Sequence, residues 1–452
     1  RSHEPLPLED EKPREAQLDY GALDALAAVR IARELLPKIQ RHGQRRLYDL
    51  WCGVLPVLAG VQLRGQTFDW DGHSALSEQW QGEQAALLSE LREHLGPSVS
   101  PNSGPQLSAW LSERLDADAL KRWPKTAKKQ TLKTDADTLA LFAHLPIVQP
   151  LLRYKAVTKL LSTYSASYPK HRHPITGRLH PEFTLGLTRS GRVCASRPNT
   201  QQAPKLPAFR ALFTAPTGKV LLSADYSQIE LVVAALLSKD AAMLEVYRQG
   251  GDLHRTTAAA IAGVAPDHVT PEQRQAAKPV NFGNLYGQGP AGLAKTAQVD
   301  YGVMMTTTEA KQALTRFMLA YPQLEHWKRQ RVAEAMQYRQ VRTALGLVRD
   351  FDAQGEGFLK GEAQNIPVQG SAAEILMATL NRLPDALAGL DAALYHTVHD
   401  ELTLEVAPDD AEHAGQALQS AMVQGFLDVF PEAGDVVALP EVKQGPHWAA
   451  VH

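Results

Sequence analysis

Two aspartates carry the clearest chemical signal in the sequence. Asp225 closes the apolar run "KVLLSAD", and Asp400 lies in the polar turn of "ALYHTVHDELTLEVAP". Either aspartate alone is typical of a turn or a helix cap. Two carboxylates at strand ends of one sheet can instead converge, as two-metal phosphoryl transfer requires for Mg²⁺ ions roughly 3.5–4 Å apart. The pair predicts a divalent-metal site. Glu401 could assist, although its place in an extended turn points it elsewhere.

The segment "RQAAKPVNFGNLYG" sets two cations and two aromatic residues at intervals of four. A step of four drifts only about 40° around a helix axis, so their side chains would form one stripe. The stripe consists of Arg274, Lys278, Phe282 and Tyr286. It fits an amphipathic helix with aromatic residues in the core and cations that reach water. It also fits a triphosphate grip, with aromatic residues against base and sugar. Pro279 predicts a kink or a helix start near residue 278.

A third cluster is cationic. The stretch "KRWPKTAKKQTLKTD" contains, against one acid, Lys121, Arg122, Lys125, Lys128, Lys129 and Lys133. Composition alone favours a solvated, lysine-rich loop. Clustered lysines also bind nucleic-acid phosphates without reading their sequence, so a phosphate-tracking tip is the competing interpretation.

The composition limits the class of protein. The 452 residues are 44% hydrophobic and 21% charged, an ordinary globular balance in a chain long enough for two or more lobes. The net charge of −2 gives no global basic field, so a polyanion would need locally gathered cations. Cys52 and Cys194 form no C-x-x-C pair, which favours a reducing cytoplasm over a disulfide framework or a zinc site. The longest apolar stretches are about half a membrane span, and residues 1–16 lack a signal-peptide core.

These residues need elements to position them. Apolar periodicity and turn signals predict helices over 20–42, 47–63, much of 75–122 and most of 252–340, and strands over 219–225, 393–398 and 402–406. A Pro/Gly/Ser loop at 96–106 breaks the second helical region, and a tight turn at His399–Glu401 joins the last two strands. The pattern predicts a mixed α/β body with a long helical insertion between its two acid-bearing strands.

Six ordered motifs resemble those of family A DNA polymerases, the DNA polymerase I-like group. They are "TRSGRVCASRPNTQQAP", "DYSQIEL", "GDLHRTTAAAI", "RQAAKPVNFGNLYG", "NIPVQGSAAEI" and "VHDE". The resemblance covers roughly residues 15–452. It implies a mixed α/β fold shaped like a right hand, with a palm sheet, a helical thumb and helical fingers. It also implies template-directed addition of dNTPs to a primer 3′-OH by two-metal-ion phosphoryl transfer.

The resemblance also divides the chain. It implies a polar tail and the end of a 3′–5′ exonuclease-like domain at 1–42, then the start of the palm at 43–74 and the thumb at 75–165. The palm continues at 166–235, with the template–primer strand and the first metal motif. The fingers follow at 236–350, and the palm with the second metal motif at 351–452. Tyr20 and Asp24 resemble the last of three exonuclease motifs, whose partner acids lie upstream in the family. We therefore expect a fragment, or a shortened polymerase, without complete proofreading.

The motifs imply roles residue by residue. Two Mg²⁺ ions, for which Mn²⁺ can substitute, would be held by Asp225, Asp400 and the main-chain carbonyl of Tyr226. The incoming nucleotide would contact Gln228, Glu230, His254, Arg274, Lys278, Phe282 and Tyr286. Primer–template DNA would contact Lys125, Lys128, Lys129, Lys133, Arg192, Asn199, Asn365, Gln369 and His399. The lysine-rich stretch thereby matches a thumb tip. The expected partners are primer–template DNA and dNTPs, bound by a monomer without membrane association.

Three of these residues would select the nucleotide. Glu230 resembles the family's ribose gate, which collides with a 2′-OH. Phe282 has no hydroxyl to replace a missing 3′-OH, which should disfavour dideoxynucleotides. Tyr286 would occupy the templating-base pocket while the fingers are open.

The chain departs from the family pattern at cationic positions. Val232, Gly361 and Gln275 stand where arginine is common in the family, and Leu347 and Val348 replace two arginines of a "GRRR" turn. These changes put affinity and processivity in question but leave the chemistry intact.

Two other interpretations stay open. A single-subunit RNA polymerase would also present an early aspartate and a late His-Asp pair, although Glu230 and the "RLHPEF" region look like the DNA enzymes. A catalytically decayed DNA-binding protein is the other. The joint presence of Asp225, Lys278, Phe282 and Asp400 argues against decay.

Overall fold

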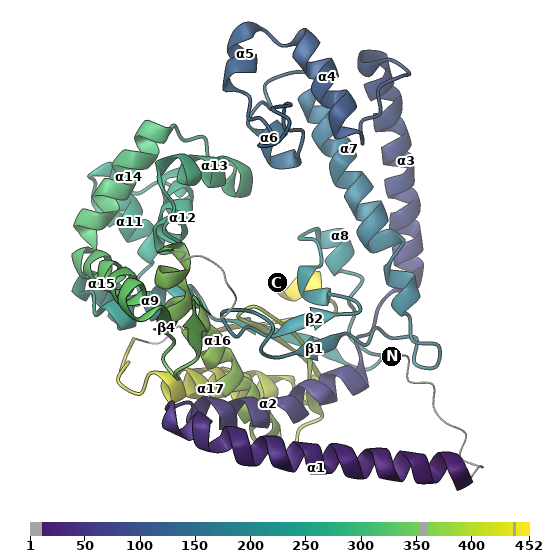
Figure 1. Cartoon of the computed structure of the whole chain (residues 1–452), viewed down its shortest axis with the longest axis vertical. Helices are drawn as coiled ribbons and strands as arrows, with labels where there is room; N and C mark the ends of the chain where they lie inside the picture. The colour runs from purple at the N-terminus through teal and green to yellow at the C-terminus, as the bar shows by residue number, and fades with distance from the viewer. Residues whose placement is uncertain (1–10, 353–359, 437–439) are drawn as a thin grey trace.

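The structure is a computed structural model that describes residues 11–352, 360–436 and 440–452. Figure 1 shows three bodies: a sheet with covering helices at the bottom, a helical arm on the right and a helical lobe on the left. Of the predicted polar tail, residues 1–10 lie outside the described residues, and the part from Glu11 onward belongs to a helix. Within the described part of the chain, no helix has both the length and the apolar character needed to cross a membrane.

The central sheet has antiparallel strands in the order β6-β7-β3-β8. They are β6 (Ala392–Val398), β7 (Glu401–Val406), β3 (Val220–Asp225) and β8 (Glu441–Gly445). Apolar pairs such as Leu222 opposite Leu404 are buried, which fixes the register. The predicted strands are confirmed. Glu401, however, is the first residue of β7 rather than a turn residue, because it pairs with both Val398 and Asp225.

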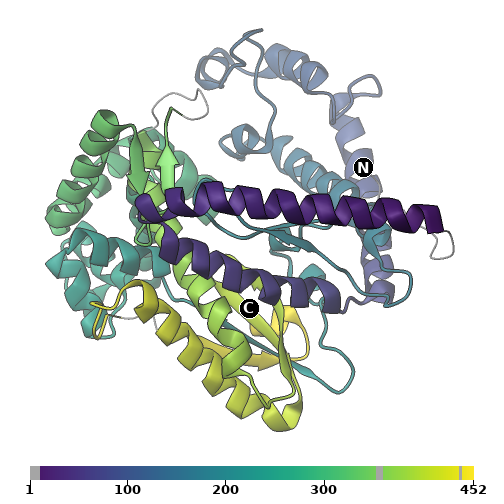
Figure 2. The same ribbon diagram turned by 60° about the horizontal axis from the view of Figure 1, so that its bottom comes forward.

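Helices cover the sheet below. α2 (Arg45–Arg64) packs on β6, α17 (Ala411–Val429) packs on β3, and α16 (Lys360–Ala386) contacts both helices. Fully buried side chains such as Val54, Ile375 and Phe426 fill the core between these elements. α1 (Glu11–Arg41) lies along the outer side of the molecule next to α2 (Figure 2). The helices predicted from residue 20 to residue 63 are thereby confirmed.

The arm consists of α3 (Trp70–Leu95), α4 (Gly104–Arg114), α5 (Ala117–Arg122), α6 (Ala136–Ala140) and α7 (Val148–Leu160). Side chains start several of its helices by accepting a first-turn N–H, namely Asp69, Ser103, Asp116 and Asp135. Leu91, Leu107 and Leu139 are fully buried between the helices. The predicted break between α3 and α4 is confirmed, with α4 starting inside it at Gly104.

The lobe consists of α9 (Ile229–Ser238), α10 (Ala241–Arg248), α11 (Leu253–Ala262), α12 (Pro271–Leu285), α13 (Pro290–Tyr301), α14 (Thr307–Ala320) and α15 (Pro322–Tyr338). α12 carries the four-residue stripe. Thr270 and Gln273 form a reciprocal capping box at its start, with Pro271 at the first helical position. Because this cap starts the helix at Pro271, the predicted helix start near residue 278 is wrong, and Pro279 lies inside the helix.

Short elements complete the chain. They are η1 (Leu161–Ser165), η2 (Tyr168–His171), β1 (Glu182–Thr184) paired with β2 (Cys194–Ser196), η3 (Thr200–Gln202), α8 (Pro207–Arg210), η4 (Pro266–His268), β4 (Gln340–Arg342) paired with β5 (Val348–Asp350), η5 (Pro408–Asp410) and α18 (Trp448–Val451). The predicted divisions after residues 74 and 235 fall inside α3 and α9, so each of these helices joins two bodies.

The arm and the lobe touch at their far ends. Lys295 on α13 lies 3.0 Å from Asp137 on α6, and Gln298 donates to the carbonyl of Ala140 at 3.1 Å. Figure 1 shows α6 facing α13. Both charged side chains are about half exposed, so the ion pair contributes little stability.

One buried carboxylate caps two helices of the lobe. Asp240 is fully buried, and its Oδ1 accepts the N–H groups of Ala242 and Met243 at the start of α10. Its Oδ2 accepts those of Gln323 and Leu324 at the start of α15. Asp240 therefore fixes α15 relative to the end of α9.

We expect Asp240→Ala to lower the free energy of unfolding by about 3 kcal/mol, because it removes two caps and leaves buried N–H groups unpaired. Asp116→Ala is the matched control, since Asp116 caps α5 alone, 2.7 Å from the nitrogen of Ala119. The control should lose about 1 kcal/mol. Urea denaturation followed by circular dichroism measures both variants, and equal losses would contradict the double-cap role.

Candidate active site

The sheet brings the two aspartates to the same end of neighbouring strands. Asp225 is the last residue of β3, and Asp400 lies in the turn between β6 and β7. The N–H of Tyr226 donates to the carbonyl of Asp400 at 3.3 Å, so the two segments lie side by side. His399 adopts a left-handed conformation, with φ of 57°, that makes this turn tight. The register of β3 on β7 is what places the carboxylates together.

Both carboxylates lie where ionisation is disfavoured. Burial and the charge of Asp225 raise the pKa of Asp400 to about 6. Burial and the charge of Glu401 raise the pKa of Asp225, against the opposite effect of Lys443 and His452. Like charges held close in a half-buried site form a local excess of negative potential. A bound cation would relieve that repulsion.

This donor set fits a hard divalent cation that brings further oxygen ligands with it. Among the residues that the structure describes, no group of three or more His, Cys, Asp or Glu side chains is arranged to hold a metal. Mg²⁺ usually binds through one or two carboxylates and completes its shell with waters and substrate phosphates. Two carboxylates at one end of the sheet match this way of binding Mg²⁺. They match less well a structural metal site, in which protein side chains supply all the ligands.

Glu401 belongs to the core rather than to the site. Its side chain accepts hydrogen bonds from Ser223 Oγ at 2.7 Å and Trp448 Nε1 at 3.0 Å, and it pairs with His452 Nδ1 at 2.7 Å. Burial raises the pKa of Glu401, but these three partners lower it below its usual value. Its carboxylate is therefore committed to packing α18 on the sheet, although Glu401 lies opposite Asp225 in the strand register and raises the pKa of that residue.

The stripe on α12 is only partly covered by the rest of the lobe. Its members, Arg274, Lys278, Phe282 and Tyr286, are all partly exposed. On the other side of the helix, Ala277, Val280 and Asn281 are at most 2% exposed. The rings of Phe282 and Tyr286 lie 6.3 Å apart and nearly parallel. Phe282 packs against the main core, whereas Arg274 and Lys278 stay partly exposed and can meet a ligand, which favours the triphosphate-grip interpretation for the cations.

Side chains of α11 hold the stripe's polar half. Arg274 forms an ion pair with Asp252, the N-cap of α11. His254 Nδ1 lies 2.7 Å from Asn281 Nδ2, so this ring nitrogen accepts and the other ring nitrogen carries the proton. Burial and the charges of Arg274 and Lys278 lower the pKa of His254 to about 4, despite Asp252. A neutral imidazole that can donate to a phosphate therefore lies beside two cations.

Glu230 connects the stripe with the aspartates. Its Oε2 accepts from the hydroxyl of Tyr286 at 2.8 Å, and its Oε1 forms an ion pair with Arg192. The charge of Glu230 also contributes to the raised pKa of Asp400. Gln228, in a left-handed conformation with φ of 56°, turns the chain from β3 into α9, on which Glu230 lies. One buried carboxylate of α9 thus joins the end of α12 to Arg192.

A cavity of about 810 Å³ opens beside this junction. Arg192, Asn365 and Gln369, all predicted to contact DNA, line it together with Tyr286. Asn365 Oδ1 and, near the same junction, Gln228 Oε1 are buried with no hydrogen-bond partner among the described residues. Such acceptors suit donors on a bound ligand.

Two further predicted DNA contacts, Asn199 and His399, lie outside that cavity lining. Asn199 caps η3 and accepts the N–H of Gln202 at 3.2 Å, so it also has a local structural role. His399 precedes Asp400 in the turn. Partial burial and the charges of Arg192 and Lys205 lower its pKa.

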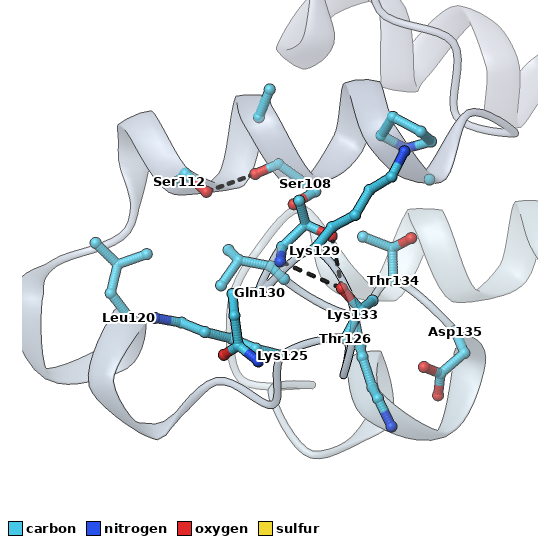
Figure 3. A pocket seen from close by; sticks show the side chains of 15 residues that line it. Ser108, Ser112, Leu120, Lys125, Thr126, Lys129, Gln130, Lys133, Thr134 and Asp135 are labelled. Atoms are coloured by element: carbon cyan, nitrogen blue, oxygen red, sulfur yellow. Dashed lines mark hydrogen bonds between the residues drawn. The ribbon is translucent and has the colours of Figure 1, made fainter.

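The predicted cationic tip forms the far end of the arm. Lys125, Lys129 and Lys133 line a cavity of about 690 Å³ under α4 (Figure 3), and Lys128 is exposed on the same loop. Trp123 is 2% exposed and stacks on Phe142, with 3.9 Å between the ring centroids. Its Nε1 donates to the carbonyl of Lys133 at 2.8 Å, which anchors the loop. The lysines therefore project from a fixed platform.

Some participants were missed from the sequence. Asp252 and Asn281 hold Arg274 and His254, and Trp123 anchors the lysine loop. The "GDLH" segment and the lone tryptophan inside the lysine stretch were the available signals. Neither signal shows which side chain would be its partner.

The departures occupy explicable positions. Val232 is fully buried in α9, where an arginine would need a buried partner. Leu347 packs against the core, Gln275 is half-buried on α12, and Gly361 lies close to the carbonyl of Tyr286. Val348 begins β5, and the next residue, Arg349, pairs with Glu362 at 3.0 Å.

Comparison with known proteins identifies the class. The family model of DNA polymerase family A matches residues 71–450. The chain belongs to this family, and its mixed α/β fold is that of a family A polymerase domain with palm, fingers and thumb, as the motifs predicted.

Individual relatives agree. The thermostable DNA polymerase I of Thermus filiformis is 35% identical over 435 residues, 94% of this chain and 50% of the relative. The DNA polymerase I of Pseudomonas aeruginosa is 32% identical over 449 residues, 96% of this chain and 47% of the relative. The chain thus spans about half the length of these curated relatives. The polymerase domain of Pol1 from M. smegmatis, in complex with DNA primer-template and dNTP, superposes with a TM-score of 0.84 at 28% identity, covering 94% of this chain and 75% of that chain.

The pKa of Asp400 gives a prediction for stability. Because the folded-state pKa of about 6 exceeds the usual value near 3.9, ionisation of Asp400 destabilises the fold as the pH rises through that range. Without divalent ions at about pH 7.5, Asp400→Asn should raise the free energy of unfolding by on the order of 2 kcal/mol. The gain should shrink toward pH 5. Thermal denaturation with and without Mg²⁺ measures this. Mg²⁺ should stabilise the wild type but not the variant, and equal stabilisation of both would contradict the metal site.

Proposed function

We propose that this chain is a monomeric, template-directed DNA polymerase that adds dNTPs to a primer 3′-OH by two-metal-ion phosphoryl transfer. The observation that carries the proposal is one junction: a carboxylate pair suited to divalent ions stands beside Glu230, which bonds the cationic and aromatic face of α12. Family membership and the DNA- and dNTP-bound structural neighbour support the same assignment.

The three bodies receive roles from this assignment. Residues 43–74, 166–235 and 351–452 form the palm, residues 75–165 the thumb and residues 236–350 the fingers. Primer–template DNA lies between thumb and palm. The tip lysines Lys125, Lys128, Lys129 and Lys133 contact its phosphates, since clustered lysines neutralise a backbone without reading bases.

The palm residues hold the reacting atoms in place. Asp225, Asp400 and the main-chain oxygen of Tyr226 would hold two Mg²⁺ ions, or Mn²⁺ in their place. Such ions would supply Lewis acidity at the primer hydroxyl and neutralise charge on the phosphates. Little covalent chemistry is left to the protein, so its contribution is position and electrostatics.

The finger helix binds the nucleotide. Arg274 and Lys278 contact the phosphates, together with the protonated ring nitrogen of the neutral His254. Arg274 exchanges its ion pair with Asp252 for a phosphate as the nucleotide arrives. Phe282 lies against the base and sugar, and its lack of a hydroxyl disfavours dideoxynucleotides.

Glu230 and the cavity beside it select the substrate. Held by Arg192 and Tyr286, the Glu230 side chain cannot easily move aside for a 2′-OH, and Gln228 supports the same pocket. Tyr286 occupies the template side of this junction until the fingers close. Arg192, Asn365, Gln369, Asn199 and His399 contact the primer–template, where minor-groove acceptors are alike in every correct pair. These contacts test the shape of the pair.

Primer extension tests the chemistry. Asp225→Ala and Asp400→Ala should each lower the rate at least about a thousandfold, because each removes one of two carboxylate ligands. Glu401→Gln is the matched control. It changes the neighbouring acid, whose partners are Ser223, Trp448 and His452, and should keep at least about a tenth of the activity.

The same assay separates the alternatives. Extension with dNTPs that far exceeds extension with rNTPs supports the DNA polymerase. Dominant rNTP use would favour the single-subunit RNA polymerase. DNA binding without extension by the wild type would identify a decayed protein.

The tip lysines predict a salt effect. Replacing Lys125, Lys129 and Lys133 together with glutamine should weaken primer–template binding and flatten the plot of log Kd against log salt. The slope should fall by about one for each phosphate that the variant no longer neutralises. Lys311→Gln is the control, because it removes one exposed charge from α14 in the fingers. An unchanged slope in the triple variant would show that the tip does not contact phosphates.

A further inference from the structure

A lysine is buried behind the finger helix. Lys328 on α15 is 4% exposed. Its Nζ donates to the carbonyl of Asn284 at 2.5 Å and to the Oδ1 of Asn284 at 2.8 Å, while Glu325 lies 3.9 Å away. Neither of these partners, Asn284 nor Glu325, belongs to the proposed site. A buried charge needs such partners, because an unpaired one is very costly.

The environment of this amine disfavours its charge. Burial and the charge of Lys360 lower the pKa of Lys328 to about 8, and Glu325 opposes the shift only in part. Lys311 of α14 lines the cavity of about 280 Å³ beside it. An apolar residue would avoid the desolvation penalty altogether. The bonds to Asn284 are therefore the feature that a lysine provides here and an apolar residue would not.

Asn284 is placed at the end of the finger helix. It is 5% exposed and lies in the last turn of α12, where helix carbonyls lack partners from the next turn. Its carbonyl accepts the N–H of Gly287 at 3.0 Å as well as the amine. A cation at this position also complements the negative end of the helix dipole. Lys328 thus caps α12 from another helix.

The two ends of α12 are held differently. At the first half, Arg274 pairs with Asp252 through side chains that are 35% and 26% exposed, and Arg274 is a residue that would contact the nucleotide. At the last turn, the bonds to Lys328 are buried and involve no residue of the stripe. The first contact can exchange its partner for a nucleotide phosphate, whereas the second lies behind the helix and is buried.

The helix that carries Lys328 is tied to the body of the protein. α15 packs on α9 and α16, and Asp240 caps its first turn. Trp327 and Leu324 belong to the main core. The amine therefore connects the end of α12 to a part of the fold that does not depend on the nucleotide.

We propose that Lys328 is a positioning residue that acts through Asn284 as the fixed pivot of α12, about which the nucleotide-binding half of the helix moves. This inference rests on the proposed polymerase function. A fixed pivot keeps the Arg274 and Lys278 side chains on the same path each time the helix moves. They then contact the phosphates in the correct geometry only when the nucleotide is correctly paired. A loose pivot would let the helix reach the phosphates along several arcs.

Single-nucleotide incorporation on a primer–template tests the pivot. The variants are Lys328→Met, Asn284→Leu and the double variant, which replaces the polar pair by an apolar pair and should fold even if a single variant does not. Lys311→Met is the matched control, since it removes a lysine from the same cavity at an exposed position on α14. Each protein is assayed for its maximal rate, its half-saturating dNTP concentration, its discrimination against a mismatched dNTP and its thermal midpoint.

We expect Lys328→Met and the double variant to raise the half-saturating dNTP concentration about tenfold and to lower discrimination, with the maximal rate within about threefold of wild type. These two variants should agree with each other, because both remove the whole interaction. Asn284→Leu should show the same defect in weaker form, because the main-chain carbonyl of residue 284 still accepts from Lys328. Lys311→Met should stay within about twofold of wild type.

A merely structural role gives a different pattern. If the variants lose thermal stability but keep the wild-type dNTP dependence and discrimination, Lys328 is not a pivot. If Lys311→Met shows the same defect as Lys328→Met, the effect is one of charge in the cavity and the inference is also wrong. A wild-type protein that extends no primer would overturn the proposed function itself, so the two failures are distinguishable.

Discussion

The structure depends on two like charges being held together by backbone pairing. The carboxylates of Asp225 and Asp400 would repel one another in a flexible chain. The register of β3 on β7 nevertheless fixes both residues at the same end of the sheet. The bond from the Tyr226 N–H to the Asp400 carbonyl closes that end. Apolar burial along both strands stabilises the register and thereby offsets the electrostatic cost. A half-buried carboxylate pair that disfavours its own ionisation is a site that gains from a cation.

The same constraint organises the helical lobe. Glu230 follows Asp225 closely in the chain, so the strand that places one metal-suited carboxylate also places the carboxylate that bonds Tyr286 and Arg192. α12 is held by α11 at its first half and by Lys328 at its last turn. Its stripe stays partly exposed, with Phe282 packed against the main core. Acidic groups near each other thus serve different ends: one pair attracts cations, and the third carboxylate fixes the aromatic end of α12.

The departures from the family pattern become intelligible in this setting. Val232 lies in the fully buried part of α9, where an apolar side chain packs without a partner. Lys328 and Asn284 show the opposite choice, a polar pair at a buried position behind α12. The chain therefore has fewer cations at several positions near the proposed DNA and nucleotide surfaces, while it keeps a buried cation inside the fingers. Both features act on how the lobe is held.

Local patterns in the sequence determined the elements and the chemistry of the site. Apolar periodicity located α2 and the strands β3, β6 and β7, and the six ordered motifs predicted the family. The spacing of Arg274, Lys278, Phe282 and Tyr286 put them on one side of a helix, because a helix repeats nearly every four residues. The predicted start of α12 near residue 278 is wrong, because that prediction used Pro279 and left out the capping box at Thr270. Only the tertiary structure decided that Glu401 turns into the core, that Asp252 pairs with Arg274, and that Lys328 caps α12. Those outcomes depend on partners that are distant in the chain or lie on other elements. A sequence pattern records what a residue can offer, whereas packing decides which partner receives it.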